Sequence, residues 1–78
     1  MTEYIPLSEL PIGTVCKVVS VDVDNRELRR FSDLGIVEGT MMKSLMVSPL
    51  GDPVAYLIRG AVFAIRREDS SRITVERY

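Results

Sequence analysis

The segment from Ser48 to Pro53 constrains the fold of this chain more than any other. It reads Ser-Pro-Leu-Gly-Asp-Pro, so two prolines enclose a Gly-Asp pair. Proline lacks the amide donor that a strand ladder needs, and Gly-Asp favours a turn. A strand that reaches Ser48 therefore has to end there, and the apolar run that starts at Val54 has to begin a new one.

Glycine, proline and period-two alternation divide the rest of the chain into equally short elements. Leu7–Leu10 predicts a single helical turn. The expected strands cover residues 14–23, 41–48, 54–59, 62–66 and 73–77. The valines that share one face of the first strand are Val15, Val19, Val21 and Val23. Gly60-Ala61 has the length of a two-residue hairpin connection between the third and fourth strands.

One helix is expected between the first two strands, over residues 26–34. Asp24 can cap its first turn with a side-chain oxygen, and Gly35 suits the left-handed position that follows a helix. The apolar residues that repeat at spacing three along it are Leu28, Phe31 and Leu34. Because a helix of about two turns is not stable alone in water, this apolar side is expected to lie on the sheet.

These elements predict a mainly β protein: a small antiparallel barrel of about five strands with one short α-helix after the first strand. At 78 residues the chain is expected to form one domain, 1–78, with a modest core. Its single cysteine cannot form an intramolecular disulfide, no apolar run approaches the length of a membrane span, and the N-terminus lacks the features of a signal peptide. The expected location is therefore cytoplasmic.

The composition argues against two classes of function. The chain has no histidine, and neither Cys16 nor any serine has an evident activating partner in the sequence, so we do not expect an enzyme. A formal net charge of -1 and few aromatic residues argue against a nucleic-acid partner. A small nucleic-acid-binding barrel stays open as an alternative.

Three carboxylates around the expected helix start, Asp22, Asp24 and Glu27, are the candidate metal ligands. Hard oxygen ligands suit iron(II), manganese and magnesium. Helix capping by Asp24 and the helix dipole acting on Glu27 explain the same residues without a metal. Cys16 is interpreted first as a small buried apolar group. No cofactor is required, while weak binding of a divalent transition metal such as iron stays open.

Arginine-rich and methionine-containing segments favour docking to another protein. Met42 and Met46 would share one face of a regular strand and form an apolar patch if that face points outward. The residues expected to dock a partner are Arg29, Arg30, Asp33, Met42, Met46, Leu50, Gly51 and Asp52.

The chain resembles the FeoA family, small cytosolic SH3-like barrel proteins of bacterial ferrous iron uptake, from about Leu7 to Val75. The motifs that carry the resemblance are Leu7 through Gly13, Arg29 through Gly35, Gly39, Pro49-Leu50-Gly51-Asp52-Pro53, Arg59-Gly60 and Ala64-Ile65-Arg66. The resemblance implies an SH3-like barrel with a core over about 7–75.

The resemblance also implies an accessory or regulatory role in ferrous iron transport. The chain would act by docking to the cytosolic part of a FeoB-type membrane transporter and would meet the membrane only through that partner. Weak self-association stays open. The first alternative is a stand-alone transition-metal-sensing module, similar to the SH3-like domains of metal-dependent repressors.

Overall fold

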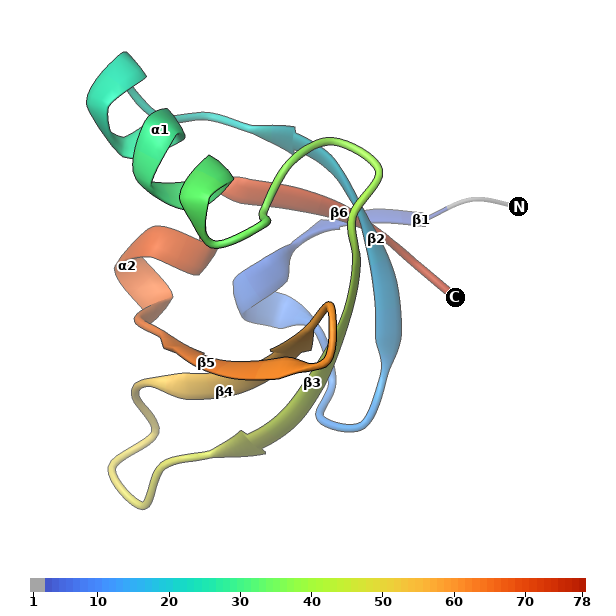
Figure 1. Cartoon of the computed structure of the whole chain (residues 1–78). Helices are drawn as coiled ribbons and strands as arrows, with labels where there is room; N and C mark the ends of the chain where they lie inside the picture. Colours follow the sequence, from blue (N-terminus) through green and yellow to red (C-terminus); the bar gives the residue numbers. More distant parts are fainter. Residues whose placement is uncertain (1–2) are drawn as a thin grey trace.

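A computed structural model describes residues 3–78 of the chain (Figure 1). The described part contains six strands and three short helices. In chain order these are β1 (Glu3–Pro6), the 3₁₀ helix η1 (Leu7–Glu9), β2 (Val15–Val21), α1 (Asn25–Asp33), β3 (Met41–Val47), β4 (Val54–Ile58), β5 (Ala61–Ile65), α2 (Arg67–Ser70) and β6 (Ile73–Arg77).

All six strands join one antiparallel sheet in the order β1-β6-β2-β3-β4-β5, and the sheet curls around the interior (Figure 1). The mainly β, SH3-like antiparallel architecture is confirmed. The count of about five strands is wrong, because β1 pairs with β6 and adds a sixth strand, and α1 therefore follows the second strand. β1 has four residues and ends at Pro6, so its alternation is too short to identify without its pairing partner.

The core fills the inside of this curled sheet. Its largest fully buried side chains are Tyr56, Phe31, Leu7, Ile36, Met42, Ile58 and Ile73. β2 contributes Cys16 and Val18 to the core, whereas Val15 is exposed, so the face that carries Val15 points away from the core in the first half of this strand. The register of β2 against β6 shifts between Val18 and Ser20, and beyond the shift Val21 packs on the core. An irregularity of this kind reverses the alternation of faces.

The connection between β4 and β5 is Arg59-Gly60, one residue earlier than the expected Gly60-Ala61. Both residues have positive φ, 51° and 84°, and Ile58 pairs with Ala61. Two successive positive φ angles define the type I′ turn, whose twist matches that of a β-hairpin. β4 and β5 therefore form a tight hairpin.

α1 begins and ends one residue earlier than the expected 26–34, and it has the cap and the following glycine that the sequence predicts. The Asp24 carboxylate accepts a hydrogen bond of 2.9 Å from the Glu27 amide, and Gly35 has a φ of 89° just after the helix. Phe31 is buried in the core, while Leu28 stays 42% exposed. A single buried ring thus attaches α1 to the body of the molecule.

Candidate functional site

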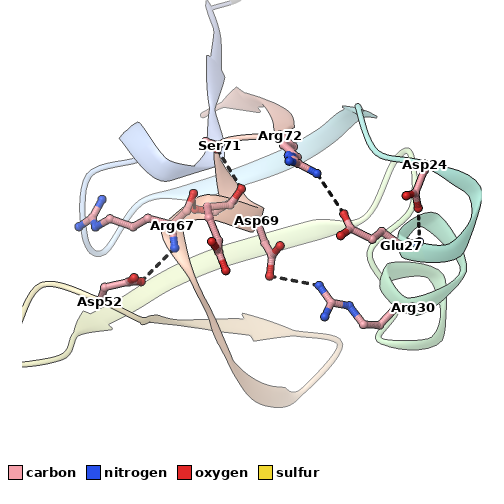
Figure 2. Close-up of polar contacts among 10 residues, drawn as sticks. Asp24, Glu27, Arg30, Asp52, Arg67, Asp69, Ser71 and Arg72 are labelled. Carbon is pink, nitrogen blue, oxygen red and sulfur yellow. Dashed lines mark hydrogen bonds and ion pairs between the residues drawn. The ribbon is translucent and has the colours of Figure 1, made fainter.

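The three candidate metal ligands do not come together as a ligand set. Asp24 is used as the helix cap, and the Glu27 carboxylate pairs with Arg72 at 3.2 Å from Oε2 to Nη1 (Figure 2). The backbone amide of Asp22 donates to the Arg72 carbonyl, and the side chain of Asp22 is exposed. Within residues 3–78 no group of three acidic, cysteine or histidine side chains could hold a metal ion. Helix capping, which the sequence offered for Asp24, accounts for the placement of Asp24, and the ion pair with Arg72 accounts for that of Glu27.

Cys16 lies in the core, opposite Met42 in the pairing of β2 with β3. Burial raises the pKa of its thiol from 9.0 to about 11, although a hydrogen bond with the Met42 backbone acts in the opposite direction. A thiol with such a pKa is protonated at neutral pH, and the thiolate is the form that binds metals and attacks electrophiles. Cys16 therefore acts as a small apolar core residue.

The expected outward pair of Met42 and Met46 is wrong, because Met42 is only 2% exposed and belongs to the core. Met46 remains 65% exposed. The register of β3 against β4 shifts between Ser44 and Met46, so the two methionines do not share a face although they are four residues apart. Only Met46 remains as a surface candidate from this pair.

Leu50 projects from the turn between β3 and β4 and is 95% exposed. The turn itself is held firmly. The Gly51 amide donates to the Ser48 carbonyl at 2.8 Å, and the amide and Nε of Arg67 bind Asp52 and Gly51 of the turn. A solvent-exposed leucine on a fixed turn is suited to enter an apolar pocket of a partner.

Arg67, at the start of α2, is the residue that fixes this turn, and the sequence did not single it out. Its amide donates to Asp52 Oδ1 at 2.9 Å (Figure 2). Its Nε donates to the Gly51 carbonyl at 2.8 Å, and its Nη1 donates to the Ser8 carbonyl at 2.9 Å. These partners lie 15, 16 and 59 residues away in the sequence, so no local pattern could reveal the role of Arg67.

The candidates on α1 form a charged surface. Arg29 and Asp33 are exposed, and Arg30 reaches from α1 to Asp69 of α2 with an Nη2–Oδ2 distance of 3.1 Å (Figure 2). The guanidinium carbon of Arg30 also lies 5.2 Å from the centre of the Phe31 ring, within the range of a cation–π contact.

The structure therefore divides the expected docking residues between two patches. Figure 1 shows α1 at one end of the molecule and the turn after β3 at the other, with α2 and β5 between them. We call the first the α1 patch, which comprises Arg29, Arg30 and Asp33. We call the second the Leu50 patch, which comprises Met46, Leu50, Gly51 and Asp52.

The fold defines a small SH3-like β protein, and its surface within residues 3–78 offers charged and apolar patches and no cluster of three metal-binding side chains. The chain belongs to the FeoA family, because the FeoA domain model matches residues 5–77. Within residues 3–78 no helix is long and apolar enough to span a bilayer.

Three known proteins illustrate the relationship. The chain is 36% identical over 70 residues to an Fe(2+) transport protein A/Fe(2+) transporter FeoB fusion protein of Porphyromonas gingivalis, a match that covers 90% of this chain and 8% of that protein. It is similar to FeoA of Chlorobium tepidum, with 38% identity, a TM-score of 0.87, and coverage of 94% and 70% of the two chains. FeoA of Stenotrophomonas maltophilia, an SH3 domain protein solved in complex with zinc, has 33% identity, a TM-score of 0.75 and coverage of 96% and 88%.

Proposed function

We propose that this chain is a non-enzymatic, cytosolic accessory protein that regulates ferrous iron transport by docking to the cytosolic part of a FeoB-type transporter. The observation that supports this most directly is the fusion relative, in which a chain similar to this one is joined covalently to FeoB. Two proteins that occur as one polypeptide are held at high effective concentration, which is useful when their separate forms have to meet.

The docking surface that we propose consists of the α1 patch and the Leu50 patch. The α1 patch supplies charge. Arg29 is exposed on the helix, and Arg30 forms an ion pair with Asp69. The Leu50 patch supplies an apolar anchor that is 95% exposed. Interfaces commonly combine a few apolar and arginine anchors, so either patch is expected to contribute to affinity.

Binding of the purified chain to the cytosolic domain of its FeoB-type transporter tests the proposal, together with iron uptake by cells that carry the same variants. Arg29→Glu combined with Arg30→Glu, and Leu50→Ser separately, are each expected to weaken binding at least about tenfold. Lys43→Glu, an exchange of charge at an exposed position of β3 away from α1, is the matched control and should bind normally.

The proposal is wrong if folded variants with both patches altered bind the transporter domain and support iron uptake as the unaltered chain does. Circular dichroism and amide NMR spectra establish that each variant is folded. Binding that is lost in only one variant would restrict the docking surface to the corresponding patch.

We further propose that docking requires no resident metal, and that nucleic acid is not a partner. The zinc complex of the relative from Stenotrophomonas maltophilia is the observation that favours a metal-responsive module as a second candidate function. Titration of the reduced chain with iron(II) under anaerobic conditions, followed by amide NMR, separates the two. Saturable changes confined to Asp22, Asp24 and Glu27 would favour the metal-responsive module.

A further inference from the structure

The sheet has two edge strands, β1 and β5, and they differ in how they are protected. β1 has four residues, ends at Pro6, and carries Glu3, which pairs with Arg77 at 3.5 Å. Proline and charge at an edge discourage pairing with another chain. β5 reads Ala-Val-Phe-Ala-Ile and contains neither. An apolar, unprotected edge strand is a template for an additional strand.

The pairing of β5 identifies which backbone groups are available. In a two-residue hairpin the residues next to the turn, Ile58 and Ala61, form a hydrogen-bonded pair, and hydrogen-bonded pairs then alternate along the ladder. Val62 and Ala64 fall in the non-bonded pairs, so their N–H and C=O groups point away from β4. Within residues 3–78 no backbone hydrogen bond outside the ladder involves either residue.

A groove of about 480 Å³ lies alongside this edge, between β5 and α1. Phe31 of α1, Leu34 just after α1 and Ile65 of β5 supply apolar atoms to its wall, and Glu68 of α2 also lines it. The ion pair between Arg30 and Asp69 borders it. An extended chain that paired with β5 would direct alternate side chains toward these apolar atoms, since successive side chains of a strand point to opposite faces.

The charges around β5 determine which kind of segment fits. Arg59 precedes the strand and Arg66 follows it, both are exposed, and neither takes part in an ion pair within residues 3–78. Two β5 strands from two copies, paired antiparallel about Phe63, would bring Arg66 of one copy next to Arg59 of the other at both ends. Like charges in that arrangement repel, so a second copy is a poor occupant. A segment with carboxylates at its ends is a good one.

We propose that the edge of β5 binds an extended segment of a partner protein by strand addition. The segment has apolar side chains at alternate positions and Asp or Glu at both ends. Backbone hydrogen bonds to Val62 and Ala64 hold the segment, the groove beside α1 receives its apolar side chains, and Arg59 and Arg66 bind its carboxylates. This site does not depend on the identity of the partner. It is separate from the Leu50 patch and shares Arg30 with the α1 patch.

The test is selection of a random octapeptide library against the whole chain, followed by affinity measurement with the selected peptides. The expected result is enrichment of peptides with alternating apolar residues and acidic ends, which shift the amide NMR signals of Val62 and Ala64. Ala64→Pro removes a donor that β4 does not use, and it should weaken binding at least about tenfold. Ala64→Val keeps the donor and is the matched control.

A second arm leaves the protein unchanged, in case Ala64→Pro fails to fold. Two peptides are compared, one N-methylated at the odd-numbered backbone amides and one at the even-numbered amides. Only one of them should lose binding, because only one set of amides faces β5.

The contribution of charge is tested with a protein variant. Arg59→Asn combined with Arg66→Gln should weaken binding and reduce its dependence on salt.

Three results would overturn the proposal. The first is the absence of any enriched peptide family. The second is a set of selected peptides whose binding is insensitive both to Ala64→Pro and to N-methylation in either phase. The third is a dimer in sedimentation equilibrium that becomes monomeric with Ala64→Pro, which would make the occupant of the edge a second copy of this chain.

Discussion

The α1 patch and the Leu50 patch lie at opposite ends of the molecule and are held in place by different interactions (Figure 1). α1 is attached by one buried ring, Phe31, and by exposed ion pairs that reach Asp69 and Arg72. The turn that carries Leu50 is held by two hydrogen bonds from one residue, Arg67, which also donates to the Ser8 carbonyl of η1.

This difference indicates how each patch presents itself to a partner. Exposed ion pairs contribute little to the free energy of unfolding and weaken with salt. The charged side chains of α1 that form them, Glu27 and Arg30, can therefore exchange their partners in a complex. Hydrogen bonds from a guanidinium to fixed backbone carbonyls have defined geometry, so the Leu50 turn is preorganised. α2 connects the two, since Arg67 and Asp69 both lie in it.

The largest effect is expected from Phe31→Ala, which removes the buried attachment of α1. Truncation of a buried phenylalanine costs about 3–5 kcal/mol of the free energy of unfolding. Urea unfolding measures this loss, and Leu28→Ala on the same helix, at a side chain 42% exposed, should cost much less. Equal losses for the two variants would contradict the view that one ring attaches α1.

Arg67→Ala should have the next largest effect and should act on the other patch. It removes the side-chain bonds to the Gly51 and Ser8 carbonyls but keeps the backbone bond to Asp52. We expect a loss of about 1–2 kcal/mol of the free energy of unfolding, together with faster amide exchange at Gly51. Arg66→Ala is the control. Unchanged exchange at Gly51 would mean that Arg67 does not fix the turn.

Asp24→Ala should destabilise α1 alone. Loss of a helix cap costs about 1 kcal/mol. The amide of Glu27, which donates to Asp24, should exchange faster, while amides of the Leu50 turn keep their rates. Asp22→Ala, two residues earlier and exposed, serves as the comparison and should leave stability nearly unchanged. If Asp22→Ala lowered the free energy of unfolding as much as Asp24→Ala does, helix capping would not explain the effect of Asp24→Ala.

The smallest effect is expected for the ion pair between Arg30 and Asp69, which joins α1 to α2 at 3.1 Å. A double-mutant cycle of Arg30→Ala and Asp69→Ala should give a coupling energy of about 0.2–1 kcal/mol that falls as salt is added. A coupling that is larger and independent of salt would show that the α1 patch is as firmly fixed as the Leu50 patch.

Local signals in the sequence were sufficient for much of the fold. Asp24 caps α1, and Gly35 adopts positive φ, as their positions in the sequence indicated. Alternation was reliable only within regular stretches. It failed at Met42 and Met46, because the extra residue of a register shift reverses every side chain that follows.

The expected docking residues show the same division between local and tertiary information. The Leu50 turn could be located from its prolines, and it is exposed as a turn of that composition should be. Its attachment to Arg67 could not be predicted, because the two segments meet only when β5 and α2 have folded against the turn. The free edge of β5 likewise emerges only from the strand order.

By itself, the sequence located five of the strands and α1, and it indicated which family the chain resembles. Those features follow from the backbone preferences of single residues, above all glycine, proline and a capping aspartate. Only the tertiary structure decided the sixth strand, the inner and outer faces of β2 and β3, and the separation of the α1 and Leu50 patches. These depend on the free energy of packing segments that are distant in the chain, and no single residue or short pattern contains that information.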